Sequence, residues 1–336
     1  MSSEETSAAD VVPWRPPNHS PYRPLGGTPA AMKVSVVICT YAEEMYGHFE
    51  DALESVRAQT YDDVEIVVVV DGNEDLYERV ESDHGGDEGL TLHCNEENVG
   101  LSASRNNALE FVTGDVVALI DDDAVADERW VEELVAVYEG TDAIAAGGRM
   151  TPIWVDGRPG FLPEEFYWLV GVTHRGFADP GEEVRNTFGS NISFRTEVLE
   201  GLGGFEAEVG RQGEKNLQAH ETELCARMRE EYGRGVVYNP DAEVGHKVFE
   251  WRTDKQWLFE RAFWQGYSKR AMESLVSADA SQEESEFLEQ LLTEFVPSRV
   301  RSLVAGPDTE KAAQLVTLFV LTGTIGLGYL YGLLEW

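Results

Sequence analysis

An acidic triplet directly follows a strongly apolar run. The run is Val116–Ile120 (VVALI), and the triplet is Asp121-Asp122-Asp123. Alternation along an extended chain points Asp121 and Asp123 to the same side. Two such carboxylates suit a hard divalent cation, Mg²⁺ or Mn²⁺, that keeps coordination positions for phosphate oxygens. A solvated turn is the alternative, and the position after a buried strand favours the metal site.

A second segment has the composition of an anion site. Residues 98–106 read NVGLSASRN, which combines a glycine turn, the start of a helix and Arg105 in its first turn. Backbone N–H groups at a helix N-terminus and a nearby guanidinium bind phosphate groups. This segment is therefore a candidate diphosphate site. An arginine that only makes a surface or structural ion pair is the alternative.

Three further polar residues have two interpretations each. Asp71 follows the run Glu65–Val70 and either caps the next helix or contacts a nucleotide base or ribose. Glu221, in His220-Glu221, opens a helix and is either a general base or an acidic residue that the helix dipole favours. His246 is either a third metal ligand or a histidine satisfied by its neighbours.

Strands and helices that would position these residues alternate along the first half of the chain. Runs of β-branched residues predict buried parallel strands, and the segments between them have helical spacing. The predicted strands are 34–40, 65–70, 90–94 and 116–120, and the predicted helices are 49–58, 73–80 and 102–112. This order predicts an open, doubly wound, mostly parallel α/β sheet with helices on both faces, which binds ligands outside the carboxyl ends of its strands.

The second half predicts a mixture of elements. Turns are expected at Gly147-Gly148 and Gly203-Gly204, and helices at 219–231, 257–272 and 283–295. The part Trp257–Tyr267, which includes Arg261, suits a helix at a membrane surface. Residues 312–334 carry no charge and are long enough to span a bilayer, with Gly328 and Gly332 allowing a second helix to approach. A buried helix of the folded domain and a helix lying in the plane of the membrane surface are the alternatives there.

The composition is acidic but suits a folded protein. Lys and Arg total 26 against 62 Asp and Glu, a net charge of −36, while 42% of the residues are hydrophobic. Nucleic acid is disfavoured as a partner because it is bound by clustered Lys and Arg. The charge favours adaptation to molar salt, where a Debye length of about 3 Å screens self-repulsion. Three widely spaced cysteines form no disulfide framework.

In this order, the pieces resemble the family 2 inverting glycosyltransferases, which have the GT-A fold. The resemblance covers residues 33–250 and rests on VSVVICTYAE (34–43), VVVVDG (67–72), NVGLSASRN (98–106), ALIDDDA (118–124), GSNISFRTEVLEGLGGFE (189–206) and HETELCAR (220–227). The acidic composition and the apolar C-terminal segment are similar to haloarchaeal transferases that build N-glycans on dolichyl phosphate, some of which move a hexuronic acid.

The resemblance implies how the donor would be bound. Thr40 and Glu43 would contact the nucleotide, and Asp71 the base or ribose. Arg105 would contact the diphosphate, and Asp121 would also lie against the donor.

The resemblance also implies the metal site and the base. Asp121 and Asp123 would form the Asp-x-Asp motif that binds Mg²⁺ or Mn²⁺, with His246 as a third ligand. Glu221 would be the catalytic base. The family pattern usually has Glu-Asp where this chain has His220-Glu221, so either of these two residues is a candidate for the base.

The implied reaction is a single displacement at the anomeric carbon of a nucleotide sugar. The metal and Arg105 neutralise the leaving diphosphate, while Glu221 takes the proton of an acceptor hydroxyl. Because a phosphate acceptor needs no base, a lipid-linked saccharide is favoured over bare dolichyl phosphate as acceptor. A dolichyl phosphate sugar synthase and a non-catalytic membrane-bound nucleotide-sugar binder are the alternatives. A nucleotidyltransferase is disfavoured because the loop Tyr41–Glu44 is acidic and lacks glycine.

These expectations divide the chain into regions. Residues 1–31 are a Pro-rich disordered tail, and 32–250 are the catalytic domain, with a nucleotide-sugar half (32–125) and an acceptor half (126–250). A helical membrane-proximal region (251–311) and a transmembrane helix (312–334) follow. Arg299, Arg301 and Lys311 precede the apolar segment, which places the catalytic domain on the cytoplasmic side of the cell membrane. Other glycan-assembly transferases are expected as further partners.

Overall fold

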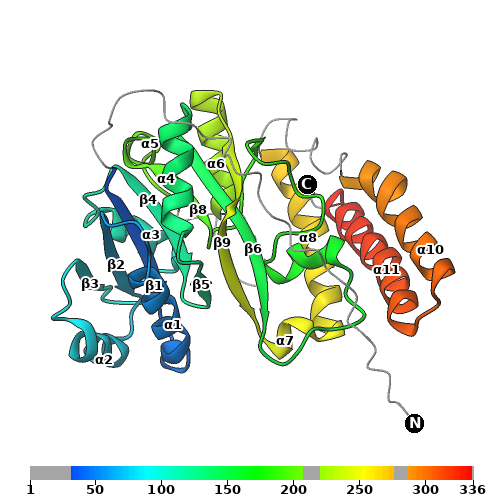
Figure 1. The fold of residues 1–336 in the computed structure, drawn as a ribbon, viewed down its shortest axis with the longest axis horizontal. Helices are drawn as coiled ribbons and strands as arrows, with labels where there is room; N and C mark the ends of the chain where they lie inside the picture. Colours follow the sequence, from blue (N-terminus) through cyan, green and yellow to red (C-terminus); the bar gives the residue numbers. More distant parts are fainter. Residues whose placement is uncertain (1–31, 207–219, 276–286, 335–336) are drawn as a thin grey trace, which may run out of the picture.

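A mixed sheet with helices on both faces forms the body of the protein (Figure 1). The computed structural model describes residues 32–206, 220–275 and 287–334. The predicted tail at 1–31 and the first residues of the predicted helix 283–295 lie outside the described residues.

The sheet has a parallel half and a mixed half. Its strand order is β3-β2-β1-β4-β8-β6-β9-β5, with β7 beside β9. The strands are β1 (Val34–Thr40), β2 (Val64–Val70), β3 (Leu90–Cys94), β4 (Val116–Asp121), β5 (Ala124–Ala126), β6 (Ala145–Trp154), β7 (Glu183–Val184), β8 (Ile192–Arg195) and β9 (Val236–Val248). The strands β1 to β4 pair in parallel, as predicted. Beyond them β8 is antiparallel to β4 and β6, and β9 is parallel to β6 but antiparallel to β5 and β7.

Alternate residues of the apolar strands point into two separate cores. Val36 and Ile38 belong to the first core and Val37 to the second, as expected for a strand buried on both faces. The first core is covered by α1 (Tyr46–Arg57), α2 (Glu74–His84) and α4 (Trp130–Gly140). The second is covered by α3 (Leu101–Leu109), α5 (Thr196–Leu202) and α6 (His220–Tyr232). The prediction of a doubly wound α/β sheet is confirmed.

A third core joins the C-terminal helices to the sheet. It contains Phe166 of the 3₁₀ helix η2 (Glu164–Val170), Leu258 and Leu318, with Val248 from the end of β9. The helices around it are α7 (Glu250–Thr253), α8 (Lys255–Leu275), the π-helical turn η5 (Leu291–Phe295), α10 (Val296–Ala305) and α11 (Thr309–Gly332). Figure 1 shows α8, α10 and α11 side by side, on the opposite side of the molecule from β3. The boundary after residue 250 stays a prediction, because this core has members on both sides of it.

The prediction of a turn at Gly147-Gly148 is wrong, whereas Gly203-Gly204 does form one. Both residues of the first pair lie inside β6, where a Cβ on Gly147 would be 2.0 Å from Thr187 Oγ1 and one on Gly148 1.7 Å from Ala242 O. The glycines therefore permit close packing within the sheet at the register shift between β6 and β9. Gly203 and Gly204 have φ of +74° and +76° after α5.

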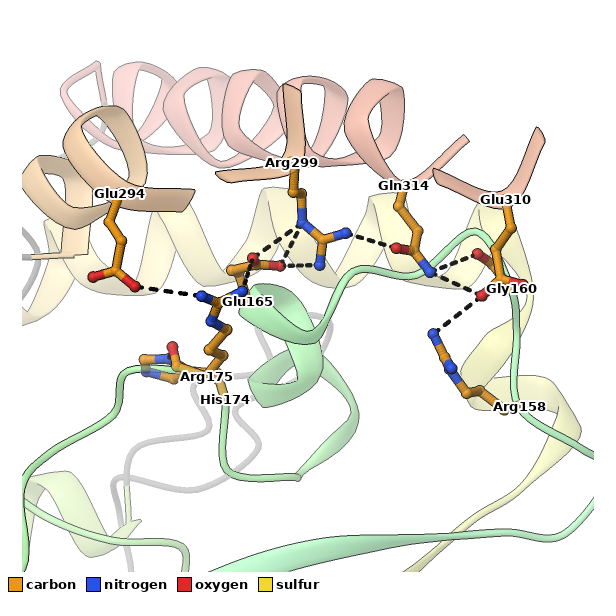
Figure 2. Close-up of polar contacts among 9 residues, drawn as sticks. All are labelled: Arg158, Gly160, Glu165, His174, Arg175, Glu294, Arg299, Glu310 and Gln314. Carbon is orange, nitrogen blue, oxygen red and sulfur yellow. Dashed lines mark hydrogen bonds and ion pairs between the residues drawn. The ribbon is translucent and has the colours of Figure 1, made fainter. Parts of the chain in front are cut away.

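A polar network attaches α10 and α11 to the loop and helix that follow β6 (Figure 2). The fully buried carboxylate of Glu165 accepts hydrogen bonds from Arg299 Nε, at 3.0 Å to each oxygen. Arg299 also donates to Gln314 Oε1 over 2.6 Å, and Gln314 Nε2 donates to Gly160 O and Glu310 Oε1, both at 3.0 Å. Because Gln314 lies in the second turn of α11, the beginning of this helix is fixed to the folded domain.

Glycines also hold α11 against α8 farther along. A Cβ on Gly328 would lie 1.9 Å from Phe263 O, and one on Gly266 of α8 would lie 2.0 Å from Ile325 O. The predicted close approach at Gly328 therefore occurs, with a helix of the same chain as its partner. By length and composition α11 is the one helix among the described residues that could cross a membrane, with a mean hydropathy of 1.6 and 22% of its most apolar window buried.

We expect Gly328→Ala to destabilise the packing of α8 and α11. The added methyl group meets backbone atoms that cannot turn away, which costs about 1–3 kcal/mol. Gly326→Ala is the control on the same helix, because nothing lies within 4 Å of its Cβ position. Thermal unfolding of both variants at high salt checks this, and equal midpoints for Gly328→Ala and the wild type would contradict it.

Candidate active site

A cleft of about 1280 Å³ opens at the carboxyl ends of β1, β2 and β4. Its floor contains Thr40, Asp71 and the triplet 121–123, and its opposite wall is formed by α7 and α8. The chain leaves β1 toward β2 and β3 in one direction and returns to place β4 on the other side of β1. The cleft therefore lies at the point where the strand order reverses, where open α/β sheets bind ligands.

Each aspartate of the triplet has a different partner. Asp121 Oδ1 accepts a hydrogen bond from Arg105 over 3.0 Å, and Asp122 Oδ2 accepts one from the Thr40 hydroxyl over 2.7 Å. Asp123 Oδ2 lies 3.1 Å from a guanidinium nitrogen of Arg252 in α7. The three carboxylates thus line one cleft but are held by three different side chains. The contact of Thr40 with Asp122 spans β1 and β4 at the reversal point.

Arg105 connects the acidic triplet at the end of β4 with Glu221 in α6. Its guanidinium is 3% exposed and donates to Glu221 Oε1 over 2.6 Å, to Asp121, and to Gly189 O over 3.1 Å. Glu221 thereby reaches the cleft from the first turn of α6, although it is 116 residues from Arg105 in the sequence. The predicted diphosphate role of Arg105 stays a prediction, and the structural ion pair that was its alternative is present.

The backbone at Gly189 leaves the space that Glu221 occupies. A Cβ at this position would lie 1.9 Å from Glu221 Oε1, so a residue with a side chain would displace the carboxylate. The next residue, Ser190, accepts the N–H of Asp121 on its hydroxyl over 2.9 Å. The segment 189–190 therefore positions one acidic residue on each side of Arg105.

The acidic floor of the cleft is incompletely neutralised. Burial, together with Asp123 and Asp121, raises the pKa of Asp122 to about 7, against the effect of the Thr40 hydrogen bond. Burial also raises the pKa of Asp121 despite Arg105. At Asp123 burial is outweighed by His246 and Arg252, which lower its pKa. A cation entering the cleft would therefore find carboxylates that lack full compensation.

A divalent cation fits this donor set only with help from a substrate. Asp121 and Asp123 are hard oxygen ligands in one cleft, and His246 Nε2 lies 3.4 Å from Asp123 Oδ2 with a buried Nδ1 that has no partner. Within the described residues, no three His, Cys, Asp or Glu side chains are grouped closely enough to hold a metal ion by themselves. The remaining ligands would be phosphate oxygens and water. His246 as a ligand stays a prediction.

Asp71 organises the loop before α3. Its oxygens accept hydrogen bonds from Asn95 Nδ2 over 2.8 Å and from the N–H groups of Val99 and Gly100, both over 2.9 Å. It does not cap α2, because Asn73 does so by accepting the N–H of Leu76. A base or ribose contact of Asp71 stays a prediction, and the loop that it shapes lines the cleft.

Glu43 lies apart from the other predicted residues. It belongs to the short 3₁₀ helix η1 (Glu43–Met45), is about half exposed and forms an ion pair with Arg79 at 2.5 Å. The residues that line the cleft include Thr40, Tyr41 and Met45 but not Glu43. Its contact with a nucleotide therefore stays a prediction.

Sequence reasoning missed the wall of the cleft that α7 and α8 form. Arg252, Trp257, Arg261 and Trp264 line it. The positions 257, 261, 264 and 268 of α8 recur at helical spacing, and this period was the signal that they share one face. The aromatic part of α8 that suited a membrane surface therefore faces the cleft on this side.

Comparisons with known proteins agree with the fold. Residues 35–203 match the family Glycosyl transferase family 2. The chain is 51% identical, over 90% of its length and 97% of the relative's, to a Haloferax volcanii protein named glucosyl-dolichyl phosphate glucuronosyltransferase.

Two solved structures have a similar fold. A Pyrobaculum calidifontis mannosyltransferase in complex with GDP-Man and Mn²⁺ has a TM-score of 0.55 at 19% identity, covering 94% of this chain and 91% of that one. Staphylococcus aureus TarS 1-349 in complex with UDP-GlcNAc has a TM-score of 0.52 at 16% identity, covering 88% and 82%. With its parallel half-sheet, its acidic cleft and a family match over residues 35–203, the chain belongs to glycosyl transferase family 2 and is a glycosyltransferase with the GT-A fold.

Proposed function

We propose that this enzyme transfers a glucuronosyl residue from a nucleotide-linked donor to glucosyl-dolichyl phosphate, with inversion. The observation that carries this proposal is 51% identity across 97% of a relative with that named activity. The similarity extends over 90% of this chain, so it includes both the acidic floor of the cleft and most of its wall. The acceptor is therefore a sugar hydroxyl on a lipid carrier.

Glu221 is the proposed base. Its carboxylate lines the cleft, its side chain is 20% exposed, and the bond from Arg105 fixes its orientation. It takes the proton as the acceptor hydroxyl attacks the anomeric carbon and the bond to the diphosphate breaks. Bare dolichyl phosphate would need no base, and the presence of Glu221 in the cleft supports the hydroxyl acceptor. The side chain of His220, the other candidate, lies outside the described residues.

Asp121 and Asp123 are the proposed residues for Mg²⁺ or Mn²⁺, with His246 beside them. A bound divalent cation would neutralise the charge of the leaving nucleoside diphosphate. Arg105 and Arg252 hold the two carboxylates in place from either side. Thr40 fixes Asp122 next to them, and the loop that Asp71 shapes faces the same space, where we place the nucleotide.

We further propose that α11 attaches the enzyme to the cell membrane with the catalytic domain on the cytoplasmic side. Large apolar side chains of α10 and α11 are exposed, namely Val300, Val304, Val316, Phe319, Val320, Leu327, Leu330 and Tyr331. Contact with lipid would bury them. Of the basic residues that precede α11, Arg299 is neutralised by Glu165. The proposed position of the catalytic domain on the cytoplasmic side therefore depends mainly on a supply of the nucleotide-linked donor from the cytoplasm.

Membranes that contain the enzyme should transfer label from one nucleotide-linked glucuronic acid to glucosyl-dolichyl phosphate. A panel of labelled nucleotide sugars and organic extraction of the lipid measures this. We expect EDTA and Asp123→Asn each to lower transfer at least 100-fold, because the leaving diphosphate loses its counter-ion. Asp127→Asn, outside the cleft, is the control. Label on bare dolichyl phosphate would identify a synthase instead, and binding without transfer a non-catalytic binder.

Glu221→Gln should lower kcat about 10²–10⁴-fold with little change in donor affinity, because it retains shape but removes basicity. Gly189→Ala should have a similar effect by displacing the same carboxylate, whereas Gly47→Ala, with open space around it, should not. Steady-state kinetics with circular dichroism of each variant is the measurement. A large loss in His220→Ala together with near-normal turnover in Glu221→Gln would move the base to position 220.

The membrane proposal predicts that carbonate washing leaves the full-length enzyme in the membrane fraction. Replacing Phe319 and Leu327, both more than half exposed, by Glu should release it, because charged groups are costly in hydrocarbon. Val155→Glu, an exposed position after β6, is the control. Release of the wild type by carbonate would contradict attachment through α11.

A further inference from the structure

Arg261 is a largely, not fully, buried cation that has no anionic partner among the described residues. It lines the cleft from the middle of α8. Among the described residues its guanidinium makes no hydrogen bond or ion pair, its buried Nε has no partner, and its one aromatic contact is with Trp257 at 5.9 Å. A charge that is largely withdrawn from water without compensation destabilises a fold. A side chain with this cost is therefore expected to be compensated when a ligand is bound.

A second arginine stands next to it. Arg252 in α7 lies 3.1 Å from Asp123 and 3.0 Å from His246 through its terminal nitrogens, but its buried Nε also has no partner. Burial and Arg252 together lower the pKa of Arg261 to about 10, which leaves Arg261 positively charged at neutral pH. Two adjacent guanidinium groups on one wall provide donors for an oxyanion.

Aromatic rings complete the wall. Trp257 contacts Trp251 with ring centroids 5.3 Å apart, and Trp264 lies two turns farther along α8 on the cleft side. Indole faces pack against the apolar faces of sugar rings and against guanidinium groups. The wall thus combines surfaces for a sugar with charge for an anion, on the side of the cleft opposite the strand ends.

We propose that Arg261, together with Arg252, forms a binding site for an oxyanion of the substrates, a phosphate or a carboxylate, on the α7–α8 wall beside the aspartates and distinct from the diphosphate that they would bind. This inference rests on the proposed function for its two candidate anions. They are the phosphate that links the acceptor sugar to its lipid and the carboxylate of the glucuronosyl donor.

The two faces of α8 favour the acceptor phosphate. On the face away from the cleft, Leu258 and Phe259 line an apolar groove of about 390 Å³ together with Val316 and Val320 of α11. The lipid tail of an acceptor would then lie in this groove and its phosphate near Arg261. In that arrangement the sugar of the acceptor would pack on the tryptophans and point toward Asp123. A donor carboxylate could reach the same guanidinium from the strand side, so the experiment compares both.

Titration calorimetry on the full-length enzyme at high salt tests the proposal with two pairs of probes. Citronellyl phosphate and citronellol form the acceptor pair, and nucleotide-linked glucuronic acid and glucose with the same base form the donor pair. We expect Arg261→Gln to weaken the binding of citronellyl phosphate at least 10-fold and to leave the affinity for both donors unchanged. Arg261→Lys should restore part of the lost affinity for citronellyl phosphate. Arg149→Gln, which removes an exposed ion pair outside the cleft, is the control and should leave the affinity for every probe unchanged.

The outcomes separate the possibilities. If Arg261→Gln lowers the affinity for the glucuronosyl donor but not for the glucosyl donor, the site binds the carboxylate of the donor. Unchanged affinity for both charged probes in Arg261→Gln, or no binding of either by the wild type, would overturn the proposal. Binding of citronellyl phosphate that depends on Arg261 in an enzyme that transfers no glucuronosyl residue would retain the site and reject the proposed function.

Stability without ligand gives an independent readout. Because Arg261 is unpaired, Arg261→Met should raise the thermal midpoint of the unliganded enzyme, and citronellyl phosphate should raise the midpoint of the wild type but not of this variant. A lower midpoint in unliganded Arg261→Met would show that the arginine supports the fold itself, which would contradict a site kept for a ligand.

Discussion

The ion pairs of Arg105 are the interaction on which the site depends. One guanidinium, almost completely buried, holds Asp121 at the end of β4 and Glu221 at the start of α6. Removal of one partner from such a buried arrangement leaves a charge without compensation, at a cost of about 3–5 kcal/mol. The contacts of Arg105 position the proposed metal ligand and the proposed base, and its contact with the diphosphate, which the family resemblance implies, stays a prediction. Both carboxylates therefore depend on the same side chain for their orientation.

The second constraint is that α8 is shared by the cleft and the C-terminal helices. One face bears Arg261 and Trp264 toward the cleft, while Gly266 meets α11 at backbone distance. The beginning of α11 is fixed in addition by Gln314 and the buried pair of Glu165 and Arg299. The wall of the cleft is therefore packed directly against the helix that we propose to contact the membrane. The proposed acceptor side is built on the elements that we place nearest the lipid.

Most of the parallel half of the fold was predictable because its signals are local. Apolar β-branched runs gave β1 with the observed bounds and β2 within one residue, and the weaker alternating pattern at 90–94 gave the bounds of β3. The pair Gly147-Gly148 was not predictable in this way. Glycine pairs are typical of turns, and only the approach of Thr187 and Ala242 from distant segments explains why these two lie in a strand. The roles of Asp71 and Glu43 were undecidable for the same reason, since their contacts are with residues far along the chain.

The sequence by itself determined the class of the fold, the family and the position of the acidic triplet at a strand end. Each of these follows from residues that are neighbours in the chain, so periodicity and motif order are sufficient. Tertiary structure alone decided that Glu221 meets Arg105, that Asp123 lies beside Arg252, and that α8 forms a wall of the cleft. These contacts join segments more than 100 residues apart, and their energies depend on burial, which no local pattern encodes.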